Sequence, residues 1–273
     1  MSIRAKAWNS VMTAEPGEQE FEIPASMIEG TLPPELVGGR HLQNGPGWTQ
    51  IGDRLAHPFD GHGFVRSLTL TEGGGASFRS QFVKTPAYLD ERKAGKIVHR
   101  GLGTNPSDFF LNNLRAPGTR NVSNTTIVPW AGRILSGWEG GRPYALDNES
   151  LDTIGEETFG GALPEAALLA HMRIDSESNR LIGCNLYRGP ASRFVFREFD
   201  DSGKQVAERE VSIPGMHFEH DFVATPNWYI LAGNPMKASL PKIAGAFLGS
   251  GSLINAISAD DAQGGELFLI PRG

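Results

Sequence analysis

Paired runs of apolar, β-branched and aromatic residues constrain the fold of this chain more than any other feature of its sequence. Residues 64–70 and 76–83 are such runs, and Gly73-Gly74-Gly75 separates them. Because short turn sequences join neighbouring strands that pair antiparallel, this pattern predicts a β-hairpin. The pattern recurs in residues 126–130 with 133–138, 168–174 with 180–187, 193–199 with 205–213, and 222–224 with 228–231.

Helical patterns are few. We expect a helical turn within residues 86–95, and a loop or short helices in residues 240–257, where glycines interrupt an apolar stretch. The chain contains 34 glycines and 18 prolines, which favour turns over long helices. Hairpins without intervening helices predict an all-β fold, but the pattern alone leaves a sandwich, a barrel and a propeller open. Since no linker is visible, we expect one domain over residues 1–273.

Composition limits the binding partners and the cellular compartment that we expect for this chain. The formal net charge is −6, whereas nucleic-acid recognition usually needs a basic face, so we expect no nucleic-acid partner. The single cysteine, Cys184, excludes an internal disulfide and a cysteine-based zinc cluster. Residues 1–20 lack the apolar core of a signal peptide, and no run approaches the ~18 apolar residues of a membrane-spanning helix. We therefore expect a cytoplasmic protein that touches a membrane peripherally at most.

Histidine is the residue type in this chain best suited to bind a metal. His217 and His220 are three residues apart, so on a strand they would face opposite sides and would not share one ion. His171 and His220 lie in apolar strand patterns, where a buried imidazole needs a partner. A metal and an ordinary hydrogen bond both remain open as that partner. The seven histidines are His41, His57, His62, His99, His171, His217 and His220.

Six segments, spread over most of the chain, occur in the order typical of one known family. They are residues 30–47, 57–65, 124–141, 170–175, 220–225 and 269–272, and they include Asn44-Gly45-Pro46, Trp138-Glu139-Gly140-Gly141 and His220-Asp221-Phe222. Together they make the chain resemble the N-terminal part of the carotenoid oxygenase (carotenoid cleavage dioxygenase) family. Met172 and Arg173 depart from the usual Pro-Lys of the family, and His62 fills a variable position.

The resemblance implies a seven-bladed β-propeller with Fe(II) held on its axis by four histidines. By motif match, His171 is the first of these ligands and His220 the second, while Glu139 hydrogen-bonds one of the four. No histidine follows His220, so the resemblance implies a domain truncated at its C-terminal side, with about four blades of a propeller. We expect this chain alone to be iron-poor, inactive and prone to aggregation.

The resemblance also implies a reaction and a substrate class. The family adds dioxygen across a C=C bond of an apolar polyene and releases two carbonyl products. Trp138, Phe218 and Phe109 are candidates for the substrate tunnel, although core packing is the alternative for each of them. Stilbene-cleaving relatives usually place a lysine before the glutamate, where this chain has Trp138. A carotenoid or apocarotenoid is therefore favoured over a hydroxystilbene, and an inactive propeller remnant that only binds apolar ligands is the third possibility.

Residues 238–257 are unusually apolar for a loop. Ile243, Phe247 and Leu248 are among their apolar residues, and Lys237 and Lys242 flank the stretch. The resemblance implies an apolar patch near the tunnel mouth, through which the family takes its substrate from a membrane. Exposed apolar surface rimmed by charge commonly marks such contact. The alternative is that these residues cover the core.

Overall fold

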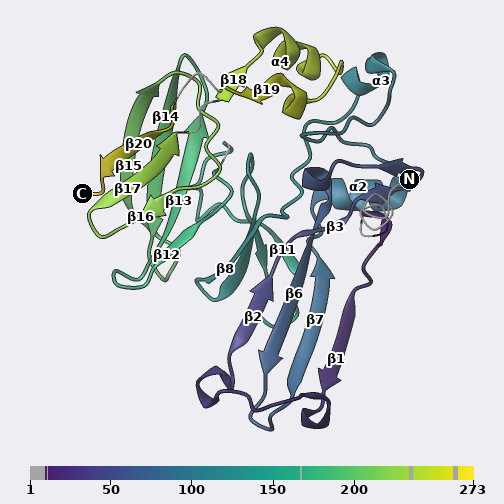
Figure 1. The fold of residues 1–273 in the computed structure, drawn as a ribbon, viewed down its shortest axis with the longest axis vertical. Helices are drawn as coiled ribbons and strands as arrows, with labels where there is room; N and C mark the ends of the chain where they lie inside the picture. The colour runs from purple at the N-terminus through teal and green to yellow at the C-terminus, as the bar shows by residue number, and fades with distance from the viewer. Residues whose placement is uncertain (1–9, 11, 167, 234–235, 261–263) are drawn as a thin grey trace.

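Antiparallel sheets follow one another along the chain (Figure 1). The structure is a computed structural model, and it describes residues 10, 12–166, 168–233, 236–260 and 264–273. Every pair of named strands in this part of the chain is antiparallel. Strands dominate and helices are short, which confirms the prediction of an all-β fold.

The first sheet has the order β1-β7-β6-β2, and β3 pairs with the start of β6. The predicted hairpin of residues 64–83 is confirmed, with Leu70 opposite Ala76 at the turn. The strands of this sheet are β1 (Gln19–Ile23), β2 (Arg40–Gln43), β3 (Pro46–Trp48), β6 (His62–Leu70) and β7 (Ala76–Phe82), and β4 (Gln50–Ile51) with β5 (Arg54–Leu55) forms a separate small hairpin.

The second and third sheets have the orders β11-β10-β9-β8 and β12-β13-β14-β15. Their predicted hairpins are confirmed, except that residues 168–172 lie outside the strand expected there. The backbone N–H groups of Leu169 and Ala170 bond to Cys184 O and His220 O instead. The strands are β8 (Thr126–Trp130), β9 (Arg133–Gly137), β10 (Tyr144–Leu146), β11 (Thr153–Glu156), β12 (Arg173–Asp175), β13 (Arg180–Tyr187), β14 (Ala191–Phe199) and β15 (Gln205–Pro214).

The fourth sheet has the order β16-β17-β20 and contains the last predicted hairpin. Its strands are β16 (Val223–Ala224), β17 (Trp228–Gly233) and β20 (Glu266–Pro271). A small hairpin of β18 (Met236–Ala238) and β19 (Ile257–Ala259) brackets the segment between β17 and β20.

Capping residues mark both ends of the helix that precedes the second sheet. In α2 (Pro86–Ala94), the Thr85 hydroxyl accepts a hydrogen bond from Tyr88 N, and Gly95 ends the helix with φ 62°, a left-handed conformation that suits glycine. This confirms the helical turn expected there. The others are α3 (Phe110–Leu114), α4 (Leu240–Phe247), and the 3-10 helices η1 (Ala25–Met27), η2 (Pro34–Leu36), η3 (Pro58–Asp60) and η4 (Leu253–Ala256).

The core is divided into clusters, several of which join two consecutive sheets. Val65 of the first sheet packs with Ile134 and Tyr144 of the second. Leu135 of the second sheet packs with Phe199 of the third. Face-to-face packing of consecutive sheets is how the blades of a β-propeller pack. The cluster between the third and fourth sheets contains Leu169, Ile182, Cys184, Phe194, Phe196, Phe222, Tyr229, Leu231 and Ile270.

A cluster of ionisable side chains is buried beside the first sheet. Glu91, His62 and Arg120 each have fully buried side chains. The Glu91 carboxylate lies 2.7 Å from His62 Nε2 and 2.9 Å from Arg120 Nη1, and it also accepts hydrogen bonds from the N–H groups of Val98 and His99. We refer to Glu91, His62 and Arg120 as the buried ionic cluster. It fastens α2 to β6 and to the segment that precedes β8.

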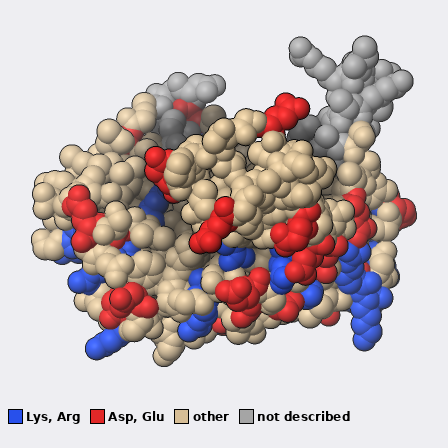
Figure 2. Space-filling model, turned by 90° about the horizontal axis from the view of Figure 1, so that it is seen from below, with Lys and Arg blue, Asp and Glu red and all other residues tan. Residues whose placement is uncertain are grey.

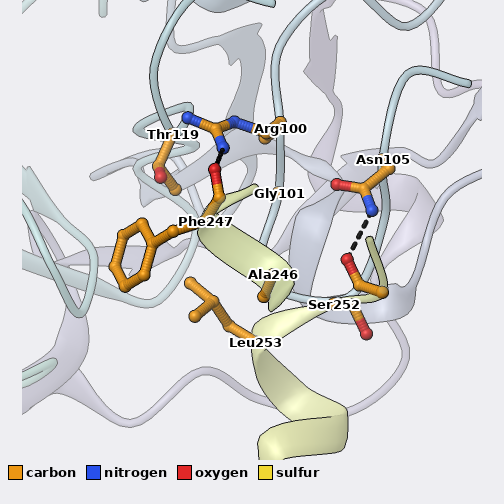
Figure 3. Close-up of a pocket in the computed structure, with 9 residues that line it drawn as sticks. Arg100, Gly101, Asn105, Thr119, Ala246, Phe247, Ser252 and Leu253 are labelled. Atoms are coloured by element: carbon orange, nitrogen blue, oxygen red, sulfur yellow. Dashed lines mark hydrogen bonds between the residues drawn. The ribbon is translucent and has the colours of Figure 1, made fainter. Parts of the chain in front are cut away.

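The segment 240–257 folds as α4 and η4 and covers residues 100–119 (Figure 3). Arg100 Nη1 donates to Phe247 O at 2.8 Å, and Asn105 Nδ2 donates to Gly251 O. Phe247 and Leu248 are each 60% exposed, whereas Ala246 is buried, so the segment both covers the body and presents apolar surface. Figure 1 places α3 beside α4, and the exposed apolar residues of that neighbouring region are Phe109, Phe110, Leu111 and Leu114.

One face of the molecule is of mixed charge. Figure 2 shows acidic and basic side chains interspersed with uncharged ones on the face that it presents. Among the helices that the structure describes, none is long and apolar enough to cross a bilayer.

Candidate metal centre

The structure brings His171 and His220 together. His171 lies two residues before β12, and His220 lies three residues before β16. Ala170 N donates to His220 O at 2.9 Å, which fastens the two segments to each other. The imidazole centroids are 5.0 Å apart, with the ring planes at 76°. Both rings are therefore placed where nitrogens from each could approach one ion.

One part of the sequence argument for these histidines is wrong. Both were expected within buried strands, but they lie in irregular segments, and the His220 side chain is 55% exposed. The segment of His171 bonds to β13 through residues before the histidine, and Ala170 N bonds to His220 O. An exposed imidazole needs no partner to offset burial, so the argument from burial does not apply to His220.

Glu139 orients His220. It follows β9, and its Oε2 lies 2.8 Å from His220 Nδ1. An ionised carboxylate only accepts hydrogen bonds, so Nδ1 carries the proton, and in the neutral ring Nε2 keeps a free lone pair. This hydrogen bond raises the pKa of His220 above its ordinary value, although burial acts in the opposite direction. Sequence reasoning left open which histidine Glu139 contacts, and in the structure it is His220.

His171 has a different environment. Burial lowers the pKa of His171 below its ordinary value, and Asp221 opposes that effect. Its imidazole is thus neutral at pH 7, which is the form that binds metals. The Arg173–Asp221 ion pair lies beside it, and Arg173 Nε donates to Phe222 O at 3.2 Å. These contacts join the segment that carries His171 to the one that carries His220.

Arg188 completes this group and was missed by sequence reasoning. It follows β13, and its Nη2 donates to Glu139 Oε1 at 3.2 Å. Its Nε donates to His217 O at 3.2 Å, and its guanidinium lies 5.3 Å from the centroid of Phe218. A lone arginine at a strand end carries no sequence pattern that would have marked it, since its partners lie far along the chain.

Other histidines have other partners. His62 belongs to the buried ionic cluster, and His99 lies 2.8 Å from Asp90. His217 lies outside a strand, like His220; its Nε2 lies 3.0 Å from Pro214 O and its ring contacts Phe268. Across the described part of the chain, His, Cys, Asp and Glu side chains form no group of three or more that could hold a metal. The candidate centre thus offers two imidazoles.

The three aromatic candidates lie in different places. Trp138 is buried beside Glu139, and its ring covers Gly140, where a Cβ would lie 3.1 Å from the ring. Phe218 is half-buried beneath Arg188, in the segment that leads to His220. Phe109 is 56% exposed at the start of α3, which Figure 1 shows apart from β12 and β16. Trp138 and Phe218 therefore flank the candidate centre, and a tunnel role for all three stays a prediction.

The residues present fit part of an iron centre. Imidazole nitrogen is a suitable ligand for iron and other first-row metals. A carboxylate on the opposite ring nitrogen, as Glu139 is on His220, fixes the tautomer and increases ligand basicity. The ring separation of His171 and His220 suits nitrogen–metal bonds of about 2.0–2.1 Å, as found for zinc.

Comparison with known sequences identifies the family of the chain. The sequence model of the retinal pigment epithelial membrane protein (RPE65) family matches residues 14–273. The chain belongs to this carotenoid oxygenase family. Apocarotenoid-15,15'-oxygenase of Synechocystis is 37% identical over 264 residues, which cover 93% of this chain and 53% of that protein. Carotenoid cleavage dioxygenase 7 of Oryza sativa subsp. japonica is 29% identical, over 97% of this chain and 52% of that protein.

A solved structure of a carotenoid oxygenase shares the fold. Cobalt-substituted apocarotenoid oxygenase of Synechocystis superposes with a TM-score of 0.87 at 32% sequence identity. The alignment covers 98% of this chain and 56% of that one. The chain thus spans about half the length of the carotenoid oxygenases that it matches.

Proposed function

We propose that this chain forms the N-terminal part of a non-haem iron(II) dioxygenase that cleaves a C=C bond of a carotenoid or apocarotenoid into two carbonyl products. The observation that carries the proposal is the convergence of His171 and His220, with Glu139 on Nδ1 of His220. The fold that accompanies the proposal is a seven-bladed propeller with iron on its axis, to which this chain would contribute about four blades.

Each residue of the centre has a part in this chemistry. Iron(II), when bound, supplies the activation of dioxygen. His171 and His220 would hold the metal through neutral imidazole nitrogens. Glu139 holds the proton at His220 Nδ1 and so keeps Nε2 free. Trp138 and Phe218 line the approach with apolar surface, which positions the polyene and excludes water.

The substrate class rests on two observations. Trp138 precedes Glu139, in place of the lysine that stilbene-cleaving relatives usually carry at this position. The similarity to an apocarotenoid-15,15'-oxygenase supports the same class. An apolar polyene also suits the exposed surface of α3 and α4, through which we propose that the protein contacts a membrane peripherally.

Cobalt binding tests the centre directly. Titration with Co²⁺ should shift the proton resonances of both His171 and His220, and His220→Ala should abolish the shift on His171 as well. If Co²⁺ shifts the resonances of neither His171 nor His220, the proposal is contradicted.

Turnover is a separate measurement. With Fe(II) added anaerobically and an apocarotenal supplied in air-saturated buffer, we expect residues 1–273 alone to leave the polyene absorbance unchanged, because two imidazoles are half of a four-histidine site. Iron-dependent loss of absorbance that disappears in His220→Ala would show that two imidazoles suffice, or that a second copy supplies the others.

A further inference from the structure

We propose that Arg188 is a positioning residue of the candidate centre, which holds the Glu139 carboxylate in the orientation that keeps the proton on His220 Nδ1. The inference rests on the proposed function and assigns the centre a further residue. It follows from the contacts of one guanidinium with two other segments of the chain.

Both oxygens of Glu139 are engaged, each by a different partner. Oε1 accepts from Arg188 Nη2 at 3.2 Å, and Oε2 accepts from His220 Nδ1 at 2.8 Å. The terminal torsion of a glutamate is broad and is not fixed by rotamer preference alone. With only His220 as a partner, the carboxylate could turn and still retain one contact. With Arg188 on the other oxygen, turning breaks a charge-assisted hydrogen bond.

Arg188 is itself fixed by the segment that carries His220. Its Nε donates to His217 O at 3.2 Å, and its guanidinium packs near the Phe218 ring, 5.3 Å from the centroid. The side chain therefore reaches from the end of β13 to Glu139 after β9 and to the residues before β16. Arg188 thus links segments that adjoin the second, third and fourth sheets.

The planar guanidinium is needed for this arrangement. Nε and Nη2 donate at the same time, one to a backbone carbonyl and one to a carboxylate. An ammonium group is a compact charge on a flexible chain and does not reproduce that fork. An exposed ion pair with a single contact contributes little, whereas Arg188 makes three contacts and its side chain is only 29% exposed.

The test reads the tautomer of His220 without any metal. Long-range ¹H–¹⁵N spectra of histidine-labelled chain, at a pH where the ring is neutral, report which nitrogen carries the proton, and His220→Ala assigns the signal. We expect a dominant Nδ1–H form in the unmodified chain, a mixture of both forms in Arg188→Ala, and an intermediate mixture in Arg188→Lys. The matched control is Arg193→Ala, which removes the Arg193–Glu210 ion pair on β14 and β15 and should leave the tautomer unchanged.

The metal supplies a second readout. Removing groups that orient a ligand typically weakens metal binding by about 10–100-fold, and we expect about tenfold weaker Co²⁺ binding in Arg188→Ala. Arg188→Lys retains the positive charge. Weaker Co²⁺ binding in both variants would therefore show that the orientation of the carboxylate, rather than the charge alone, matters. If Arg188→Ala does not fold by circular dichroism, the lysine variant carries the test.

Two results would overturn the inference. One is an Nδ1–H population in Arg188→Ala and Arg188→Lys equal to that of the unmodified chain. The other is an unmodified chain without any Nδ1–H preference. The proposed function fails separately, if Co²⁺ leaves both His171 and His220 unaffected while the tautomer still responds to Arg188.

Discussion

At the scale of single residues, the buried ionic cluster shows how charges are accommodated without water. Burial alone would raise the pKa of Glu91, but the hydrogen bond from His62 and the charge of Arg120 outweigh it and bring the pKa down to about 2. Burial also lowers the pKa of His62, despite the opposing effect of Glu91. Glu91 is therefore charged and His62 neutral near pH 7, and Arg120 supplies the compensating charge.

Replacing Arg120 should lower the free energy of unfolding. Arg120→Met leaves the Glu91 carboxylate buried without its cation, and breaking a buried ion pair in this way typically costs about 3–5 kcal/mol of unfolding free energy. Urea denaturation followed by tryptophan fluorescence measures it. Arg193→Ala, which breaks an exposed pair, should cost about 0–1 kcal/mol. A loss for Arg120→Met as small as that of the control would contradict this account of the cluster.

The same cluster predicts acid sensitivity. The pKa of His62 is lower in the folded chain than its ordinary value of 6.5, so its contribution to stability is present above pH 6.5 and is lost as the pH falls below it. The pKa of Glu91 falls from 4.5 to about 2, so its contribution is lost between those values. Urea midpoints measured from pH 8 to pH 3 should therefore decrease in two ranges. Glu91→Gln should be less stable at pH 7 and should show a smaller decrease below pH 4.5.

At the scale of elements, α4 and the residue after it have both buried and exposed apolar side chains. Its buried Ala246 and the contact of Arg100 with Phe247 O hold it on residues 100–119, while Phe247 and Leu248 face outward. Within residues 238–257, some apolar side chains thus cover the body and others are exposed, and the membrane contact stays a prediction.

The exposed side of α4 should bind membranes. Phe247→Asp places a charge where apolar contact with acyl chains is proposed, so it should reduce the fraction of protein that floats with phosphatidylcholine liposomes severalfold. Leu36→Asp is the matched control, because Leu36 on η2 is similarly exposed, at 53%. Equal flotation of the unmodified chain and Phe247→Asp would count against the membrane surface.

At the scale of the whole molecule, the outer edge of the fourth sheet stands out. Among the described strands, β20 pairs with β17 alone, and Leu267 and Leu269 on it are 72% and 60% exposed. An apolar strand with a free edge is a template for pairing with another chain.

A charge on that strand should reduce self-association. Leu269→Lys is expected to lower the light scattering of concentrated solutions, because a lysine on an edge strand disfavours strand pairing between molecules. Leu89→Lys, at an exposed position of α2, changes the net charge equally but lies on no strand. A similar decrease in both variants would indicate a general effect of charge rather than an effect of the edge.

Local features of this fold can be predicted from the sequence, whereas contacts between distant segments cannot. Hairpins such as residues 126–138 are confirmed because alternation and turn residues act locally. The approach of His171 to His220 was predictable only through family resemblance, since a hydrogen bond between distant segments establishes it. Arg188 and the buried ionic cluster have partners far along the chain and leave no local pattern.

The hydrogen bond from Ala170 N to His220 O has a consequence for the stability of the centre. Closing the long loop between the two histidine segments costs conformational entropy, and contacts of the backbone offset part of that cost. In a zinc finger, by contrast, the metal itself gathers the chain. We therefore expect that removal of a bound ion from this centre leaves the protein folded.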